Sequence, residues 1–278
     1  MQKVRTSKTT IKALSILEEL NALGEARNSE IADALELPRP TCYRLLQTLC
    51  EAGVVLSDAN THVYRPAERV LALSCGFEQE TWVSVCAKPH MKELGAELLW
   101  PIAIATLSGP SMVLRETTDP DSPLAVRRYL AGRRVGLLST ATGRVYLAYC
   151  SAQQRDILIQ VLQKSRKPED VAARNPAAVA RRLRKTRQQG FDTSRLQRQS
   201  ISWGAMAVPV FARGQILASL SARYIRKAVT RAAEREKLLP QLQETAKRIG
   251  ASFDAFSADA TGSEVNLSIA LNARRQSL

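Results

Sequence analysis

The chain has 278 residues, which is room for about two domains, and its 45% hydrophobic and 24% charged residues are typical of a folded protein in water. No apolar run reaches the roughly 18–20 residues needed to cross a bilayer, and residues 1–10 have no apolar signal-peptide core, so we expect a cytoplasmic protein without a membrane partner. The five cysteines include no Cys-x-x-Cys pair, and neither histidine stands at metal-ligand spacing from a cysteine. We therefore expect reduced thiols, no disulfide framework, no metal and no cofactor.

The net charge of +14 is typical of a protein that binds a polyanion, but the excess is not in the N-terminal quarter. Residues 1–70 contain nine basic and nine acidic side chains, whereas the remainder contains 31 basic and 17 acidic ones. Within the first part, four bases lie in residues 1–12 and six acids lie between residues 18 and 36. The arrangement of charge is therefore more informative than its sum.

The N-terminal quarter is predicted to form three helices and a hairpin. Apolar residues recur at helical spacing from Thr10 until Gly24, and Asn28 or Ser29 is expected to cap a short second helix. Pro40 is placed to open a third helix that runs to Ala52. The stretches 54–56 and 63–64, separated by an Asp- and Asn-rich turn, predict the hairpin.

The third helix has one apolar and one polar face, which is the arrangement of a winged helix-turn-helix. Cys42, Leu45, Leu46 and Leu49 form the apolar face, and the other face carries no carboxylate before Glu51. A rod of about 20 Å suits the major groove of double-stranded DNA. The candidate DNA-binding residues are Lys8, Thr10, Ser29, Arg39, Thr41, Tyr43, Arg44 and Gln47. Which of them contact bases and which contact phosphates stays open, and the alternative is a three-helix domain that only packs against another surface.

These segments also carry a family resemblance. Arg39-Pro-Thr-Cys-Tyr-Arg-Leu-Leu-Gln-Thr-Leu49 and Glu51-Ala-Gly-Val-Val55 resemble the recognition helix and wing entry of IclR-type transcriptional regulators. Residues 10–17 and 31–38 resemble the preceding helices of that family. One recognition helix in one groove reads too few base pairs for a genome, so a homodimer on two operator half-sites is expected, and the resemblance extends this to a dimer of dimers. The apolar faces around Leu14 to Leu20 and Val70 to Leu73 are the candidate contacts.

The C-terminal part is predicted to be α+β, with helices packed on an antiparallel sheet, because strands and helices do not alternate strictly. Residues 102–107 pair with 112–117 and residues 205–211 with 216–224 in two hairpins, and 124–130 is a further strand candidate. Helices are expected at 151–162, 175–189 and about 230–256, with Pro89 kinking or delaying a linker helix. The predicted domains are a DNA-binding domain at 8–68, a helical linker at 69–85, an effector-binding domain at 86–256 and a flexible tail at 257–278, poorly ordered up to Asn266.

Several runs in this part resemble the GAF-like effector-binding domain of the same family: 115–118, 132–144, 190–191, 207–210 and 218–221. Arg115-Glu-Thr-Thr118, the Gly132-Arg-Arg run and Trp100-Pro101 are most similar to MhpR-like members, which respond to aromatic acids. The resemblance implies a ligand loop at Thr140, Ala141 and Thr142, facing strand positions Ala205, Ser221 and Arg223. Ala205 replaces a cysteine, and Arg223 a small polar residue, of glyoxylate-responsive members. These departures argue against a short dicarboxylate-like effector.

The residues themselves point to an acid as well. Arg115, Arg127, Arg133 and Arg223 are expected on strands or strand edges, where a guanidinium suits a carboxylate. Leu137, Trp203 and Met206 are candidates to wall an aromatic ring. The same arginines could instead be solvated or face a second subunit, and only a convergent pair would point to a ligand. The acid that the family has after Gly190-Phe191 is not assigned, since Arg195 or a neighbour occupies that stretch.

Other functions stay open at this point. An enzyme on the GAF-like domain is disfavoured because the nucleotide, Walker, zinc-protease and nucleophile-elbow motifs are absent and Cys150 has no histidine nearby in sequence. A redox-sensing regulator would use Cys75 or Cys86. The basic run 164–198 could be a second nucleic-acid site, but its helix carries no aromatic residue for base stacking, which favours a solvated face. The expected function is a regulator that is not an enzyme and that responds to a small organic acid.

Overall fold

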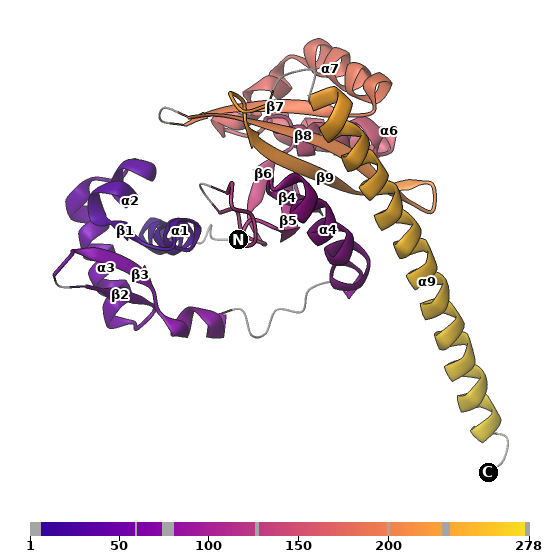
Figure 1. Cartoon of the computed structure of the whole chain (residues 1–278), viewed down its shortest axis with the longest axis horizontal. Coiled ribbons are helices and arrows are strands. Elements are labelled where there is room, and N and C mark those ends of the chain that lie inside the picture. The colour runs from indigo at the N-terminus through magenta and orange to yellow at the C-terminus, as the bar shows by residue number, and fades with distance from the viewer. Residues whose placement is uncertain are drawn as a thin grey trace, which may run out of the picture. The chain divides into compact units, whose positions relative to one another are not determined.

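The computed structural model describes residues 7–58, 60–73, 81–125, 128–198, 201–229 and 234–275, and it gives the backbone alone for 196–198, 201, 234–235 and 259–275. The chain divides into two compact units, one built from α1 to η1 and the other from η2 to α9 (Figure 1). The prediction of an α+β protein with an N-terminal winged helix-turn-helix is confirmed.

The N-terminal unit has three helices, a three-stranded antiparallel sheet in the order β1-β3-β2, and a closing 3₁₀ helix. Its elements are α1 (Lys8–Leu23), β1 (Ala26–Arg27), α2 (Asn28–Ala34), α3 (Arg39–Glu51), β2 (Val55–Ser57), β3 (Val63–Pro66) and η1 (Glu68–Leu73). The predicted helices and hairpin are confirmed, and β1 is an additional strand. The core is formed by residues such as Ile16, Leu20, Ile31, Leu46 and Tyr64.

The cap of α2 differs from the prediction. The N-cap residue is Arg27, and Asn28 and Ser29 lie inside the first turn. The Glu30 side chain accepts the Arg27 backbone N–H at 2.7 Å, so this carboxylate satisfies a donor at the start of the helix. The pairing of Arg27 with Val63 in the sheet explains the shift, because it holds Arg27 extended and places the helix start at the next residue.

The C-terminal unit is a six-stranded sheet in the order β6-β5-β4-β9-β8-β7, in which every neighbouring pair is antiparallel. The strands are β4 (Ile102–Ser108), β5 (Ser111–Thr117), β6 (Arg134–Gly136), β7 (Asp192–Arg198), β8 (Ile201–Ala212) and β9 (Gln215–Ile225). The helices are η2 (Val83–Ala87), α4 (Lys88–Leu98), α5 (Ala141–Tyr149), α6 (Ala152–Gln163), η3 (Pro168–Arg174), α7 (Pro176–Gln189), η4 (Glu234–Leu238) and α9 (Leu239–Arg275). Both predicted hairpins and the helices at 151–162 and 175–189 are confirmed.

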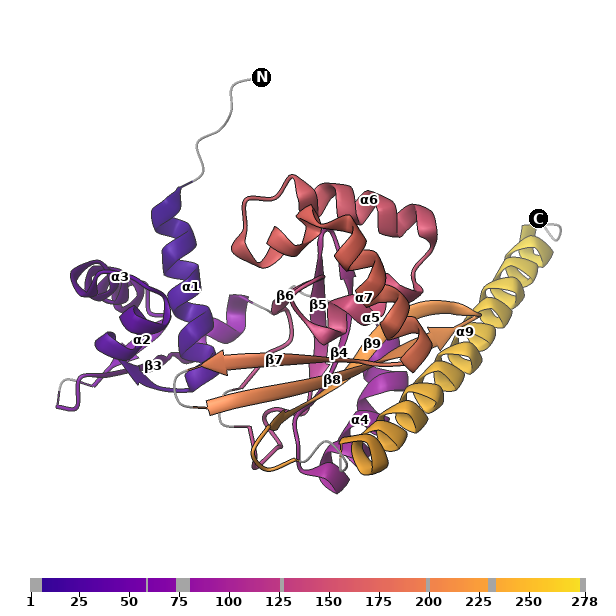
Figure 2. The ribbon, with the colours of Figure 1, turned by 90° about the horizontal axis from the view of Figure 1, so that it is seen from above.

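The two faces of the sheet are covered by different helices (Figure 2). The main core lies between one face and η2, α4 and α9, and includes Met91, Ile104, Leu220, Tyr224 and Leu242. The opposite face carries mostly small side chains and is covered by α5, with α6 and α7 on the same side. Ser219, Ser221 and Arg223 at odd positions in β9 therefore lie on the α5 face of the sheet, and this face is where the predicted ligand loop lies.

One prediction about the C-terminal part is wrong. Residues 124, 125 and 128–130 form no strand, because β6 pairs with β5 and occupies that edge of the sheet. The flexible tail at 257–278 stays a prediction; in its described part α9 continues as a helix to Arg275. Residues 257–275 contain no proline and one glycine, so nothing in this stretch breaks the helix.

The linker follows the predicted pattern where it is described. η1 ends at Leu73, and Pro89 lies in the first turn of α4, directly after the π-helical turn η2. A proline in a first turn costs no intrahelical hydrogen bond, which explains the late start of α4. The residues between 74 and 80, including Cys75, lie outside the described part of the chain.

Candidate functional site

The solvent-facing side of α3 is the first candidate site. Arg39, Tyr43 and Arg44 are exposed, whereas Thr41 and Gln47 are half-buried. The apolar side of the same helix is buried as predicted, which fixes the direction in which these side chains point. Positions 40, 44 and 47 lie on one stripe because residues three and four apart are neighbours on a helix.

Three predicted DNA-binding residues also have structural partners. Gln47 Nε2 donates to the Tyr64 hydroxyl at 3.3 Å, which links α3 to the wing strand β3. Arg39 forms an exposed ion pair of 3.7 Å with Asp33 on α2. The Thr10 hydroxyl donates to Ser7 Oγ at 2.9 Å, and Ser7 caps α1. These contacts hold the elements of the unit in place. On the exposed side of α3, Arg44 and Tyr43 are long side chains whose functional groups have no protein partner among the described residues.

The remaining predicted positions lie at helix starts. Lys8 is exposed in the first turn of α1, and Ser29 is half-buried in the first turn of α2. Two basic residues that the sequence analysis did not select are Arg27 and Arg65. Arg27 is opposite Val63 in the sheet, two residues from Arg65 along β3, so both exposed arginines share the solvent face of the wing. Alternation with the buried residues Ala26 and Tyr64 is the signal that identifies them.

The turn of the wing is closed by Asp58. Its Oδ1 accepts the backbone N–H groups of Asn60 at 2.8 Å and Thr61 at 3.3 Å. These hydrogen bonds, led by the one from Asn60, hold the pKa of the exposed Asp58 carboxyl below its usual value. The wing therefore carries an ionised acid at its turn and its arginines along its strands.

The second candidate site surrounds the N-terminal end of α5. Thr140 is the N-cap residue: its hydroxyl accepts the Gly143 N–H at 3.1 Å and donates to the Gly136 carbonyl at 2.8 Å. The hydroxyl hydrogen of Thr140 is therefore used within the protein, in the bond to Gly136. Ala141 and Thr142 are buried, and Ala141 packs against Ala207 on β8.

The small side chains of β8 and β9 complete this site. Ala205 is directly opposite Arg223, and Ala207 is directly opposite Ser221, so the structure brings the predicted strand positions together with the α5 loop. The Ser221 hydroxyl donates to the Ala103 carbonyl at 3.3 Å. Ser219, two residues earlier on the same face, is fully buried, and its Oγ has no hydrogen-bond partner in the described structure. The sequence analysis missed Ser219, although its period-two spacing from Ser221 places it on this face.

Arg223 is already paired with an acid. Its guanidinium donates to Asp119, a buried carboxylate that also interacts with the Thr117 hydroxyl. The same guanidinium lies 5.9 Å from the centroid of the Trp203 ring. The expectation of an arginine waiting for a ligand carboxylate therefore needs correction, because the charge of Arg223 is matched by Asp119 within the protein. Asp119 was not selected from the sequence.

The other selected arginines do not converge on Arg223. Arg115 Nε donates to Thr106 Oγ1 at 2.7 Å, whereas the Arg223 N–H donates to the Pro101 carbonyl. Pro101 and Thr106 are five residues apart along β4, or about 16 Å. Arg133, just before β6, is separated from β9 by two strands, which is about 14 Å at the backbone. Arg127 lies outside the described residues, and Met206 faces the opposite core.

The unassigned acid after Gly190-Phe191 is Asp192. This buried carboxylate accepts hydrogen bonds from Arg144 on α5, from Arg182 on α7 and from the Thr186 hydroxyl. Burial raises the pKa of Asp192, but the hydrogen bonds from Arg144 and Arg182 and the charge of Arg144 outweigh it, so the pKa lies below its usual value. Arg144 also donates to the Leu138 carbonyl at 2.7 Å, next to the ligand loop. Asp192 therefore fixes the position of that loop relative to α7.

The thiols give no support to a nucleophile or a redox sensor. Burial raises the pKa of both Cys86 and Cys150, so these thiols stay protonated and weakly reactive at neutral pH. His90 Nε2 lies 2.9 Å from the Ser252 hydroxyl oxygen, so this ring nitrogen is used in a contact between α4 and α9. Within the described residues, no group of three or more His, Cys, Asp or Glu side chains is arranged to hold a metal ion, and no helix has the length and apolar character needed to cross a membrane.

Comparisons with known proteins give matches to both the N-terminal and the C-terminal unit. A family model described as the IclR helix-turn-helix domain matches residues 9–59, and one described as the bacterial transcriptional regulator IclR C-terminal matches residues 79–251. The chain belongs to the IclR family. It is a DNA-binding transcriptional regulator of the IclR type with a C-terminal effector domain.

Two transcriptional regulators with similar sequences align with different fractions of this chain. The HTH-type transcriptional regulator KdgR of Dickeya chrysanthemi is 30% identical over 214 residues, covering 75% of this chain and 68% of that protein. The regulator TsaQ1/TsaQ2 of Comamonas testosteroni is 28% identical over 166 residues, so that the chain spans 59% of the length of that relative.

Solved structures show the same fold. The IclR of Thermotoga maritima superposes with a TM-score of 0.59 at 21% identity, covering 90% of this chain and 100% of the other. An IclR homologue of Microbacterium hydrocarbonoxydans, crystallised with 4-hydroxybenzoate, gives a TM-score of 0.53 at 21% identity and covers 89% and 100%.

Proposed function

We propose that this IclR-family regulator binds operator DNA through α3 and the wing, and is controlled by a small aromatic carboxylate in the C-terminal unit. In this proposal the chain acts as a regulator and not as an enzyme, and it works in the cytoplasm, where bacterial operator DNA lies. The domains predicted from the sequence, 8–68 for DNA and 86–256 for the effector, are part of the proposal.

The observation that supports α3 as the reading element is its solvent face. This face presents Arg44 and Tyr43 without a protein partner, and the thirteen residues of the helix extend about 20 Å. A guanidinium on a groove-inserted helix binds either a guanine edge or a phosphate, and the two roles differ in their dependence on salt. Arg27 and Arg65 on the wing add phosphate contacts beside the groove.

Arg44→Ala tests the DNA surface. Operator binding is measured by fluorescence anisotropy at several salt concentrations, with the full chain and a labelled duplex from the regulator's own promoter region. We expect a loss of about 1–3 kcal/mol if Arg44 contacts a base, or a salt slope reduced by about one if it contacts phosphate. Arg213→Ala, which removes an exposed positive charge in the β8–β9 turn, is the matched control and should leave both unchanged. If Arg44→Ala behaves like the control, α3 is not the reading element.

The effector proposal depends on the buried face between α5 and β9. Ser219 carries a fully buried hydroxyl without a partner, and such a group in a folded protein calls for a ligand or water. Ala103, Ala205 and Ala207 give this face of the sheet small side chains around Ser221. Trp203 beside the Arg223 guanidinium supplies an aromatic wall next to a positive charge.

In this proposal Arg223 is shared between Asp119 and the ligand. An arginine has five N–H donors, so it can hold a protein carboxylate on one edge and a ligand carboxylate on the other. Asp119 lowers the net charge at this position, and the affinity for an acid is therefore moderate rather than that of an isolated buried arginine. A 4-hydroxybenzoate-like ligand could direct its other polar end toward Ser219.

Arg223→Met tests this site, with 4-hydroxybenzoate as the probe in isothermal titration calorimetry. The substitution keeps the apolar stem and removes the charge, and we expect binding to weaken by about 2–5 kcal/mol. Because Asp119 then loses its partner, Arg223→Met/Asp119→Asn is measured beside it and should bind equally weakly while regaining stability. Wild-type affinity in both variants would show that Arg223 does not hold the acid.

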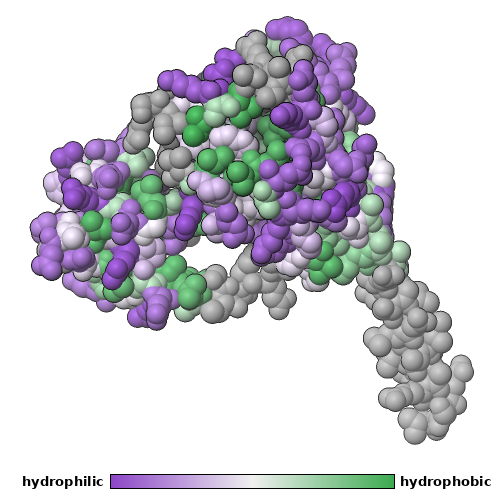
Figure 3. Space-filling view, in the orientation of Figure 1, coloured by the Kyte–Doolittle hydropathy of each residue, from purple (hydrophilic) through white to green (hydrophobic). Residues whose placement is uncertain are grey.

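The assembly proposal is a homodimer that pairs into a dimer of dimers. Of the residues predicted for the dimer contact, Leu17 and Leu20 are buried in the core of the N-terminal unit, whereas Leu14 is 54% exposed. Leu71 and Leu73 on η1 are 70% and 68% exposed. Figure 3 shows hydrophobic residues at the surface of the N-terminal unit. Light scattering at micromolar concentration measures the oligomeric state of wild type and of the variant Leu71→Glu/Leu73→Glu. A monomeric wild type would overturn the proposal, and smaller particles for the variant would assign the contact to η1.

A further inference from the structure

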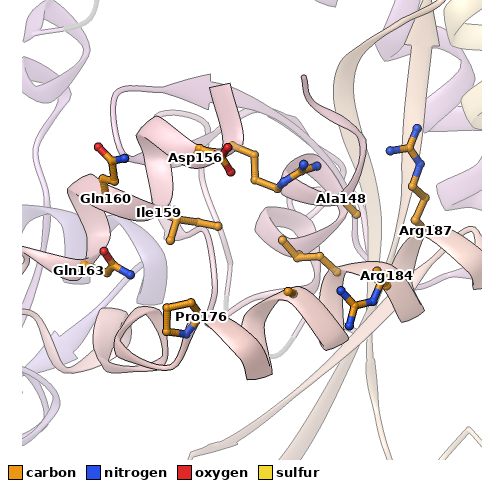
Figure 4. A pocket seen from close by; sticks show the side chains of 11 residues that line it. Ala148, Asp156, Ile159, Gln160, Gln163, Pro176, Arg184 and Arg187 are labelled. Atoms are coloured by element: carbon orange, nitrogen blue, oxygen red, sulfur yellow. The ribbon is translucent and has the colours of Figure 1, made fainter. Parts of the chain in front are cut away.

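A groove between α6 and α7 lies apart from the effector site. It has a volume of about 640 Å³, which is in the range of small-molecule sites. Its floor is formed by Ala148 near the C-terminal end of α5, whereas the ligand loop is at the N-terminal end of that helix. Figure 4 shows Gln163 and Pro176 at one end of this α6–α7 groove, and Arg184 and Arg187 toward the other.

The charged end of the groove has more bases than acids. Arg155 on α6 joins Arg184 and Arg187 on α7 in its lining, and the only carboxylate among the lining residues is Asp156. Tyr149 orients Arg187, since its hydroxyl donates to the Arg187 carbonyl at 3.1 Å and its ring lies 5.8 Å from the guanidinium. Three guanidinium groups at one end of a groove favour an anion.

These arginines differ from three other arginines of the same unit, which are paired with buried carboxylates. Arg144 and Arg182 are paired with Asp192, and Arg223 is paired with Asp119. Among the ion pairs in the described parts of the chain, none involves Arg155, Arg184 or Arg187. The carboxylates Asp119 and Asp192 are therefore used by Arg144, Arg182 and Arg223, and the guanidinium groups of the groove are left to solvent or to a ligand.

The rest of the groove is apolar or uncharged. Ile159, Ala180 and Leu183 line its middle, and Gln163 faces Pro176 at the far end. From Arg155 to Gln163 the groove follows α6 for eight residues, or about 12 Å. A ligand that fills it needs an anionic head and an apolar body. A nucleic acid does not fit this pattern, because the groove has no aromatic side chain for base stacking and its cations are confined to one end.

We propose that the α6–α7 groove is a second ligand site, distinct from the effector site, and that it binds an amphiphilic carboxylate. The carboxylate head lies between the Arg155, Arg184 and Arg187 guanidinium groups. The apolar body lies along Ile159, Ala180 and Leu183. The site shares α5 with the effector site, through Ala148 at one end of the helix and the Thr140 cap at the other.

The test uses octanoate as the probe and the full chain, in isothermal titration calorimetry. Wild type is expected to bind octanoate, and Arg184→Gln/Arg187→Gln is expected to bind it about tenfold more weakly or worse, because charge-assisted hydrogen bonds are lost. Arg181→Gln is the matched control: it removes an exposed guanidinium from the same helix outside the groove lining, and should bind like wild type. All substituted positions are exposed, and unchanged thermal melting confirms that each variant is folded.

A second variant tests the shape of the groove without changing its charge. Ala180→Phe fills the middle of the groove and should weaken octanoate binding as strongly as the double glutamine variant. Arg223→Met, which alters the effector site, should leave octanoate binding intact. The proposal is overturned if wild type does not bind octanoate, if the groove variants bind it like Arg181→Gln, or if Arg223→Met alone abolishes binding.

Discussion

The substitution Asp192→Asn removes one negative charge from the buried cluster that holds α5. The carboxylate is 1% exposed and receives hydrogen bonds from both Arg144 and Arg182. Arg144 is itself only 11% exposed, so in the variant its positive charge stays buried, with the Leu138 and Thr193 carbonyls as remaining acceptors. The effect is therefore that of a buried ion pair with one partner removed.

The expected loss follows from the burial of the two partners. Removing one member of a buried pair costs about 3–5 kcal/mol, and the asparagine amide oxygen keeps part of the hydrogen bonding, which places Asp192→Asn near 3 kcal/mol. With a urea m-value of about 2–3 kcal/mol/M, the unfolding midpoint should fall by about 1 M. Arg182→Gln removes the partner that is 45% exposed, and should cost no more than about 1 kcal/mol.

Tryptophan fluorescence in a urea titration measures this loss selectively, because Trp82, Trp100 and Trp203 all belong to the C-terminal unit. The pH dependence provides a second check. The pKa of Asp192 is lower in the folded chain than its unfolded value of about 3.9, so its stabilisation is complete above that pH and is lost as pH falls through the folded pKa. The difference in urea unfolding midpoint between wild type and Asp192→Asn should be constant from pH 5 to 8 and should become smaller below about pH 4. A midpoint for Asp192→Asn equal to that of Arg182→Gln would refute the reasoning.

Three further outcomes follow from single positions. Gly143→Ala should destabilise the C-terminal unit by about 1–3 kcal/mol in the same titration, because its Cβ would overlap the backbone of Leu137. Ser219→Ala should leave stability unchanged or raise it by about 1 kcal/mol, since it deletes an unpartnered buried hydroxyl, yet it should weaken 4-hydroxybenzoate binding in calorimetry. Burial raises the pKa of the Cys42 thiol to about 11, so iodoacetamide at pH 8 should alkylate it in urea but not in the folded chain, as peptide mass spectrometry would show.

Helices and strands that depend on a local residue pattern could be predicted from the sequence. The helical spacing in α1 and α3 and the alternation in β8 and β9 are local patterns, and each matches the observed burial. The strand expected at 124–130 shows the limit of this reasoning. Its residues suit a strand, but an edge of a sheet accepts one neighbour, and the three residues of β6 take that place. Which of two candidates pairs is decided by the whole fold.

Some residues of the candidate effector site could also be predicted from the sequence, and others could not. Ser221 and the loop from Thr140 to Thr142 could be selected from their resemblance to a family, and they lie together in the fold. Asp119 and Asp192 could not. Asp119 lies 104 positions from Arg223, and Asp192 lies 48 positions from Arg144 and 10 from Arg182 on another element, so no spacing rule identifies these pairs. The hydroxyl of Ser219 becomes informative only when the absence of a partner is known.

The buried acids also explain what the charge of +14 means for the C-terminal unit. Asp119 and Asp192 neutralise arginines that the fold encloses, so the positive potential left over belongs to exposed side chains such as Arg181, Arg184 and Arg187 on α7. That potential attracts anions of any size toward this side of the unit. The α6–α7 groove combines it with an apolar surface, and selectivity for a small amphiphilic acid requires both. Because the groove and the effector site share α5, any influence of one ligand on the affinity of the other must be matched by an equal influence in return.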